Sequence, residues 1–164
     1  MMVTEVSGNL QPFDSIDERR KASIWTRVHP IFAIGQLGIF VVSLVLLGLY
    51  FFHVVSFATV YLSVLVKIFA MIGAIVSGSL WERDVFGPWW FAHEFFLEDV
   101  MTLNVFVLHV GFLITVYAWP SNEQAMIVML LLAYGAYGFN AVQYIVRHVS
   151  GASVSGDPKA FKAA

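Results

Sequence analysis

Carboxylic acids and aromatic rings are concentrated between residues 81 and 99, in the stretch WERDVFGPWWFAHEFFLED. The stretch contains seven aromatic side chains and five of the chain's eleven acids: Glu82, Asp84, Glu94, Glu98 and Asp99. A carboxylic acid surrounded by rings at the edge of hydrocarbon is hard to ionise, because desolvation penalises the charged form. Such an acid can donate a proton near neutral pH, and a second, ionised carboxylate nearby can take one from water. The rings favour a large, flat, lipid-partitioning substrate.

Further polar side chains recur at helical spacing after this stretch. If a helix starts near Glu94, one face carries Glu94, Glu98, Thr102, Val105 and His109. Asp99 then lies about 100° round the same helix. A later segment places three phenols on one broad face with Asn140 at its edge, namely Tyr134, Tyr137 and Tyr144, followed by His148. We interpret these faces as the walls of a polar cavity.

Lys67 lies near the middle of an apolar segment. A charged side chain there costs about 2.5 to 3.5 kcal/mol on membrane insertion. Lys67 should therefore face the protein interior, near His109 or one of the tyrosines. It lies about 22 Å along a helix from Glu82, which excludes direct pairing of the two. A structural polar clamp and a functional site both remain open for Lys67.

The spacing of the histidines gives no metal-binding motif. His29, His53, His93, His109 and His148 form no HxxxH or ExxH pair of the kind that ligates zinc or di-iron centres. A haem held by His109 would need a second histidine at matching depth. The chain has no cysteine, so disulfides and thiolate metal sites are excluded.

Four apolar segments must position these residues. Hydrophobic residues make up 59% of the chain and charged residues 12%, against about 25% charged in soluble domains. The segments cover about 31–52, 57–80, 97–119 and 125–147, each long enough to span hydrocarbon as a helix. We predict an all-α integral membrane protein, an antiparallel four-helix bundle. Its parts would be a polar N-terminal segment (1–28), the transmembrane domain (29–148) and a flexible C-terminal tail (149–164).

The distribution of basic residues predicts the orientation in the membrane. The short loops after the first and third spans contain no Lys or Arg. All the basic residues except Lys67 fall on the other side: Arg19, Arg20, Lys21, Arg27, Arg83, Arg147, Lys159 and Lys162. The positive-inside rule then places both termini and the 81–99 stretch in the cytoplasm. The polar N-terminus lacks the apolar core of a secretory signal. The chain also has no basic patch interleaved with aromatic residues, so we do not expect it to bind nucleic acid.

Several segments of the chain resemble one known family, in order and with similar spacing. They are DERRKASIWT, VKIFAMIGAIVSGSLWERDVFG, FAHEFFLEDV, VLHVGFL and AYGAYGFNAVQY, between Asp17 and Arg147. The chain is on these grounds similar to the 3-vinyl bacteriochlorophyllide hydratases of bacteriochlorophyll biosynthesis. The resemblance implies a hydro-lyase that adds water to the C3 vinyl group of a (bacterio)chlorophyllide to form the 3-(1-hydroxyethyl) product. It implies no cofactor, because the magnesium is carried by the tetrapyrrole substrate.

The resemblance also carries site residues onto this chain. Its motifs match closely at Lys67, Glu82, Glu98, Asp99, His109, Asn140 and Gln143, and depart from the family at His93 and Glu94, which are therefore not assigned catalytic roles. We predict Glu98 or Glu82 as the acid and Asp99 or His109 as the group that deprotonates water. The predicted substrate-binding residues are Lys67, Trp81, Arg83, Trp89, Trp90, Phe96, Tyr134, Tyr137, Asn140 and Gln143.

Two details of substrate binding follow from the same hypothesis. Arg83 and Arg147 would pair with the free propionate of the substrate, and its magnesium would take water, His93 or His109 as axial ligand. Tryptophans such as Trp81, Trp89 and Trp90 also anchor proteins at membrane surfaces, which is the simpler interpretation of each one alone.

The expected location is the inner membrane of a phototrophic bacterium, as a multi-pass protein in contact with lipid. The many small residues are compatible with a homo-oligomer, and association with other pigment-biosynthesis enzymes stays open. The alternative function is a non-catalytic membrane tetrapyrrole carrier or assembly factor. A quinone or haem redox protein is a third reading, and a proton-coupled transporter using Lys67, Glu98 and His109 is weakened because the chain shows no inverted repeat.

Overall fold

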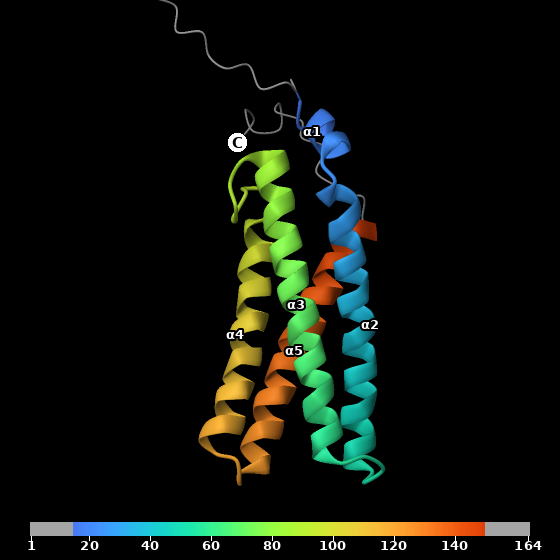
Figure 1. Cartoon of the computed structure of the whole chain (residues 1–164), viewed down its shortest axis with the longest axis vertical. Helices are drawn as coiled ribbons and strands as arrows, with labels where there is room; N and C mark the ends of the chain where they lie inside the picture. The colour runs from blue at the N-terminus through green and yellow to red at the C-terminus, as the bar shows by residue number, and fades with distance from the viewer. Residues whose placement is uncertain (1–14, 150–164) are drawn as a thin grey trace, which may run out of the picture.

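Five helices make up the described part of the chain. A computed structural model describes residues 15–149. The helices are α1 (Ile16–Ala22), α2 (Trp25–Phe51), α3 (Phe57–Phe86), α4 (Phe96–Ala118) and α5 (Glu123–Val149). The four long helices run up and down along a common axis, and α1 lies at the end where α2 begins (Figure 1). The predicted all-α four-helix architecture is confirmed. Residues 1–14 of the predicted N-terminal segment and residues 150–164 of the predicted tail lie outside the described residues.

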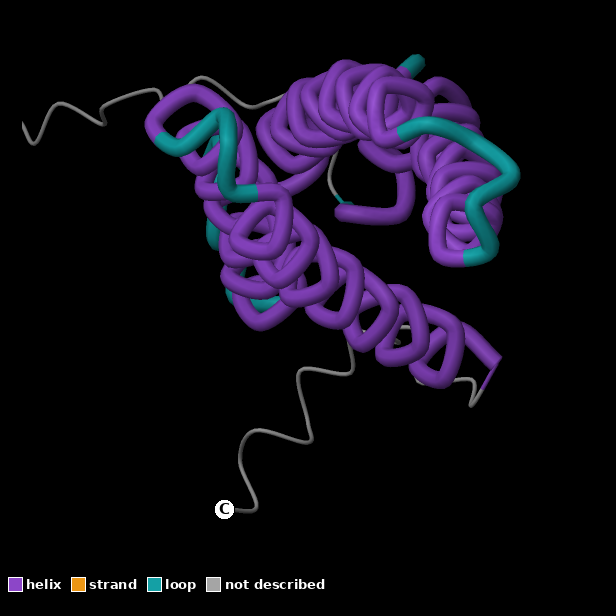
Figure 2. The backbone as a smooth tube through the Cα atoms, turned by 90° about the horizontal axis from the view of Figure 1, so that it is seen from below, coloured by secondary structure: helices purple, strands orange, loops and turns teal. Residues whose placement is uncertain are grey.

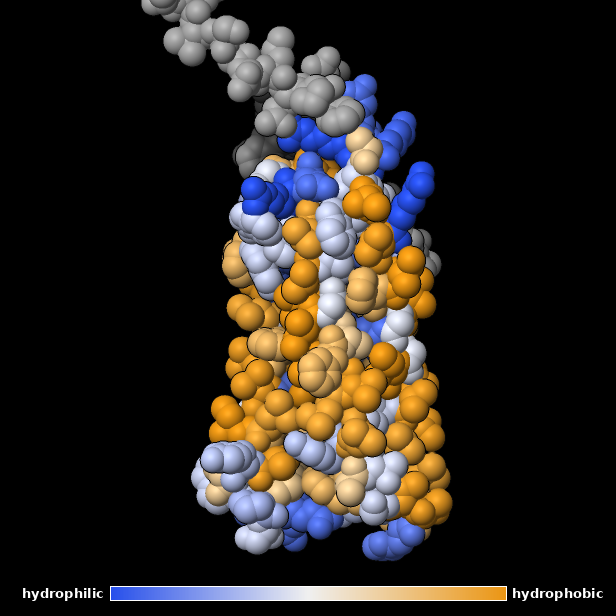
Figure 3. Space-filling model, viewed as in Figure 1, coloured by the Kyte–Doolittle hydropathy of each residue, from blue (hydrophilic) through white to orange (hydrophobic). Residues whose placement is uncertain are grey.

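The four long helices have the length and composition of membrane spans. Their most apolar windows have a mean hydropathy between 1.7 and 2.4. Figure 3 shows a broad hydrophobic band with hydrophilic residues gathered at the two ends of the bundle. Large apolar side chains point outward in this band, for example Phe69 with 74% and Ile34 with 71% of their surface exposed. Such a surface suits hydrocarbon rather than water, and helices satisfy their backbone hydrogen bonds internally there. These features indicate a multi-pass membrane protein.

The bundle consists of two helical hairpins. Helix α2 packs along α3 and helix α4 along α5, and the loops 52–56 and 119–122 that close the hairpins are seen end-on in Figure 2. The hairpins meet mainly through side chains. Phe40 of α2, for example, has its ring centre 4.5 Å from that of Tyr137 on α5.

Two helix boundaries differ clearly from the prediction: α2 begins at Trp25, within the predicted N-terminal segment and before the expected start at 31, and α3 ends later than expected. Helix α3 continues to Phe86, beyond the expected end at 80, and stops at Gly87, whose φ of +101° suits only glycine. Glu82 therefore lies on a helix. Helix α4 begins at Phe96, close to the predicted start of the span at 97, and Glu94 lies in the turn before it and not on the helix. Val105 and His109 of the predicted face are buried as expected.

Candidate active site

Two carboxyl groups meet at the end of the bundle that carries α1. Glu82 comes from the last turns of α3 and Asp99 from the first turn of α4, and their carboxyl groups lie close enough to hydrogen-bond to each other when one of them carries a proton. Only 6% of Glu82 is exposed. A hydrogen bond between two carboxyl groups requires a proton on one of them, because an ionised carboxylate can only accept. The pair therefore places an acid and a base side by side, and Glu98 is close enough to interact electrostatically with Glu82.

The loop between α3 and α4 holds this carboxyl pair in place. The Phe91 N–H donates to Asp99 Oδ2 at 2.7 Å, and the next amide, Ala92 N–H, donates to Glu82 Oε2 at 3.1 Å. Phe91 has a φ of 59°, in the left-handed region. Successive amides around such a residue form a concave anion-binding nest. The loop is itself attached to α3, because Ser79 Oγ donates to the Trp89 carbonyl at 2.8 Å.

Aromatic rings surround this end of the bundle but mostly contact one another. Trp81 packs edge to face against Phe86 and Phe95, with ring centres 5.6 and 5.3 Å away. Its other neighbour is His29, stacked at 6.4 Å, and its indole N–H donates to Thr26 Oγ1 at 3.0 Å. Trp81, predicted to stack on a substrate, is thus part of the protein's own packing.

The other predicted stacking residues lie further out. Arg83 covers the ring of Trp89, its guanidinium carbon 3.9 Å from the ring centre. Trp90 contacts Phe91, and Phe91 contacts Phe96 at 5.7 Å between ring centres. Trp89 and Phe96 remain largely exposed. These two keep ring surface available to a partner or to lipid.

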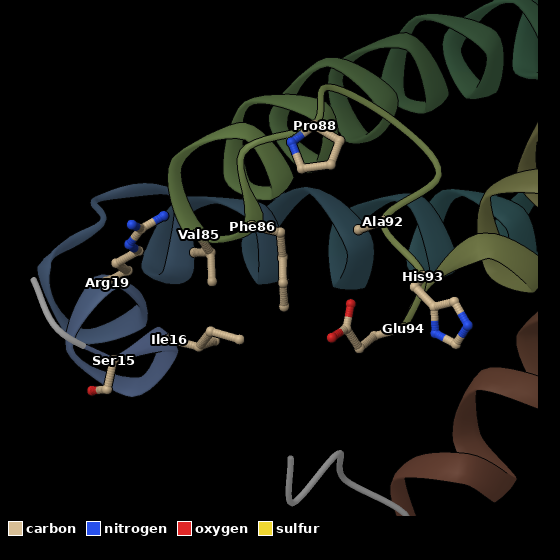
Figure 4. A pocket seen from close by; sticks show the side chains of 9 residues that line it. All are labelled: Ser15, Ile16, Arg19, Val85, Phe86, Pro88, Ala92, His93 and Glu94. Carbon is tan, nitrogen blue, oxygen red and sulfur yellow. The ribbon is translucent and has the colours of Figure 1, made fainter. Parts of the chain in front are cut away.

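A pocket of about 410 Å³ lies between α1 and the α3–α4 loop. In Figure 4 the Glu94 carboxyl group points into it from one side, opposite Ile16 and Phe86. Val85 and Ala92 form part of its wall, and Ala92 is the residue whose amide binds Glu82. The carboxyl pair therefore lies directly behind the pocket wall. The full lining is Ser15, Ile16, Arg19, Val85, Phe86, Pro88, Ala92, His93 and Glu94.

A second polar group lies in the middle of the bundle. Lys67 is fully buried, and its Nζ is 3.6 Å from the ring centre of Tyr137, 5.4 Å from that of Phe40 and 6.0 Å from that of Tyr134. The lysine faces the interior beside tyrosines, as expected. Ser43 connects α2 to α3 and α5 by hydrogen bonds to Ser63 and to the Tyr134 hydroxyl.

His109 belongs to this central group and not to the carboxyl pair. Its Nδ1–H donates to the Val105 carbonyl at 2.8 Å, and its ring centre lies 6.0 Å from that of Tyr134. It follows Asp99 by ten residues, about 15 Å along α4. Glu98 and His109 share a face of α4 but differ in depth, and Glu82 lies on α3, so the structure does not bring His109 together with the predicted acids.

The remaining predicted residues are divided between these groups. Asn140 Nδ2 donates to Thr102 Oγ1 at 3.5 Å, between the two depths, and Gln143 is partly buried near the α1 end of α5. The side chains of Arg147 and His148 lie outside the described residues. Within residues 15–149, no three His, Cys, Asp or Glu side chains are grouped so as to hold a metal ion.

Several residues at the site were not predicted. The Phe91 and Ala92 N–H groups bind the carboxyl groups of Asp99 and Glu82. Because these contacts are made by the backbone, no residue type in the sequence indicates them. His29 hydrogen-bonds Ser77 across α2 and α3 at 3.1 Å. His29 and Trp81 lie at similar distances from the loop that joins the first two predicted spans. Counting residues from that loop could therefore have predicted that the two side chains lie at the same depth in the membrane.

Comparison with known proteins identifies the family. The family model described as 2-vinyl bacteriochlorophyllide hydratase matches residues 14–150. The relative of that name from Rhodobacter capsulatus is 38% identical over 128 residues, covering 77% of this chain and 74% of the relative. The one from Cereibacter sphaeroides is 35% identical over 127 residues, covering 77% and 79%. No solved structure matches the chain. The chain therefore belongs to the 2-vinyl bacteriochlorophyllide hydratase family.

Proposed function

We propose that this protein is a hydro-lyase that adds water to the vinyl group of a bacteriochlorophyllide, forming the 1-hydroxyethyl product. The vinyl-bearing carbon is numbered 2 or 3 in different conventions for the macrocycle. Family membership supports the reaction type. The observation that carries the proposal is the Glu82–Asp99 carboxyl pair, which holds a donor and an acceptor for protons in contact.

Hydration would proceed by proton transfer followed by attack of water. Glu82, the buried member of the pair, donates its proton to the terminal CH2 of the vinyl group, which becomes CH3. The positive charge left on the adjacent carbon is delocalised into the macrocycle. A water molecule attacks this carbon through its oxygen and loses a proton to the pair through Asp99, which is only partly buried. H and OH have then been added across the double bond, the pair holds one proton again, and no electron has been transferred.

The protein surroundings would support both steps. The Phe91 and Ala92 amides keep one oxygen of each carboxyl group fixed, so that the pair is already oriented before the substrate arrives. Glu98 lies near enough to Glu82 to interact with it electrostatically, and an ionised Glu98 would favour a nearby carbocation. The magnesium would enter and leave with the substrate, and we assign the protein no cofactor of its own.

The substrate would approach through the pocket between α1 and the α3–α4 loop. The apolar side chains Ile16, Val85 and Phe86 suit one edge of a flat macrocycle, and the carboxyl pair lies behind Ala92. We place this end of the bundle at the cytoplasmic face of the inner membrane, because the chain's basic residues are concentrated there.

A direct assay tests the proposal. The purified protein is reconstituted in lipid and incubated with a vinyl bacteriochlorophyllide in oxygen-18 water, and the pigment is analysed by chromatography and mass spectrometry. We expect a 1-hydroxyethyl product that carries the labelled oxygen. Binding that returns the vinyl pigment unchanged would instead support a tetrapyrrole carrier.

A further inference from the structure

One arginine of α1 lines the pocket, and a second contacts a residue of its wall. Arg19 lines it directly, on the side of α1 (Figure 4). Arg20 lies next to it in sequence, and its guanidinium carbon is 5.4 Å from the ring centre of Phe86, which lines the same pocket. The Nε of Arg20 is buried and has no hydrogen-bond partner among the described residues. Arg19 therefore offers guanidinium donors to an anion in the pocket, and Arg20 adds an unsatisfied guanidinium N–H beside the Phe86 wall.

Hydrogen bonds hold α1 in this position. Thr26 Oγ1 donates to the Arg20 carbonyl at 2.6 Å, and Ser23 Oγ donates to Asp84 Oδ2 on α3 at 2.9 Å. Ser15 caps the helix by accepting the Glu18 N–H at 3.2 Å. These contacts tie the arginines to the end of α3 that carries Glu82.

The opposite side of the pocket is acidic. Glu94 points into it, and the Glu82–Asp99 pair lies behind Ala92. A ligand that spans the pocket therefore meets guanidinium groups at α1 and carboxyl groups at the α3–α4 loop. Because the α1 side of the pocket is basic and the loop side is acidic, we expect an anionic ligand to bind with its negative group toward α1.

We propose that Arg19 and Arg20 bind the free propionate carboxylate of the tetrapyrrole substrate and so determine which edge of the macrocycle reaches the carboxyl pair. The inference rests on the proposed function. A bacteriochlorophyllide carries this propionate as a free acid, and guanidinium groups bind carboxylates through paired charge-assisted hydrogen bonds. Arg83, predicted for this role from the sequence, instead lies over the ring of Trp89.

The test compares the free acid of the vinyl substrate with its methyl ester, which has no charge at the propionate. Hydration of both is measured with the wild type, Arg19→Gln, Arg20→Gln and the double variant. Lys21→Gln is the matched control, since it removes one positive charge from an exposed position of the same helix. We expect the wild type and Lys21→Gln to have a lower KM for the acid. The arginine variants should raise this KM by on the order of tenfold, with little change in the KM for the ester.

Each other result is decisive. A wild type that hydrates acid and ester with equal KM, or a double variant that keeps the wild-type preference, overturns the role of the arginines while the hydratase function stands. Loss of activity on acid and ester alike in the double variant also overturns it, because the arginines would then serve the fold or the chemistry. A wild type that hydrates neither substrate contradicts the proposed function itself.

Discussion

Glu82 and Asp99 are bound by amides of a loop that is itself strained and tethered. The left-handed Phe91 turns two amides toward the pair, and the Ser79 hydroxyl holds the Trp89 carbonyl two residues earlier. A left-handed non-glycine residue persists only when surrounding contacts enforce it. The geometry of the pair thus depends on residues outside the pair itself.

Replacing Ser79 should show this dependence. Ser79→Ala removes a hydrogen bond of about 1 kcal/mol and loosens the loop, so we expect kcat to fall several-fold and the Phe91 and Ala92 amides to exchange faster with deuterium. Ser56→Ala, at the far end of the bundle, is the control. Unchanged exchange and unchanged kcat in Ser79→Ala would show that the tether does not position the pair.

At the scale of helices, the two hairpins are joined by a lysine surrounded by rings. Placing Lys67 in hydrocarbon costs about 2.5 to 3.5 kcal/mol, and a desolvated cation–π contact returns about 2 kcal/mol. Rings from α2 and α5 lie within 6.0 Å of its Nζ. The ring contacts therefore offset most of the cost of burial.

This balance predicts which partner matters more for stability. Lys67→Met removes both the cost of burying the charge and the cation–π contacts. We therefore expect a change of about 1 kcal/mol or less in the free energy of unfolding. Tyr137→Leu removes the closest ring and leaves the charge, and should destabilise by about 2 to 4 kcal/mol, whereas Tyr137→Phe keeps the ring. Unfolding in detergent micelles measures all three. A Lys67→Met variant as unstable as Tyr137→Leu would contradict the balance.

The long apolar helices could be predicted from the sequence because each needs only length and hydrophobicity. Their ends are harder to predict, although Gly87 followed by Pro88 is a helix stop signal in the sequence that marks the end of α3. Glu82 and Asp99 were predicted as individual site residues, but their pairing depends on how α3 and α4 approach each other. The role of His109 stays a prediction, because a shared helix face specifies direction and not depth, and His109 lies about 15 Å along α4 from Asp99.

At the scale of the whole molecule, charge distinguishes the two ends of the bundle. The end with α1 carries Arg19, Arg20, Lys21, Arg27 and Arg83, and the loops 52–56 and 119–122 at the other end contain no basic residue. Bacterial membrane proteins keep such basic ends in the cytoplasm.

The absence of cysteine from the chain allows a clean test of this orientation. We expect Asn122→Cys to react with a membrane-impermeant maleimide in cells whose outer membrane is permeabilised, and Asp17→Cys to react only after the inner membrane is opened. Both positions are exposed. The reverse labelling pattern would place the site on the other side of the membrane.

Vinyl hydration by variants that remove one carboxyl group of the pair shows whether Glu82 and Asp99 carry out the reaction. Glu82→Gln and Asp99→Asn keep the size of each side chain but prevent the pair from exchanging a proton with substrate and water. We predict that each lowers kcat by about 10²- to 10⁴-fold, while Glu123→Gln, at the opposite end of the bundle, keeps the wild-type rate. Wild-type hydration by Glu82→Gln and Asp99→Asn would contradict the assignment of the reaction to this pair.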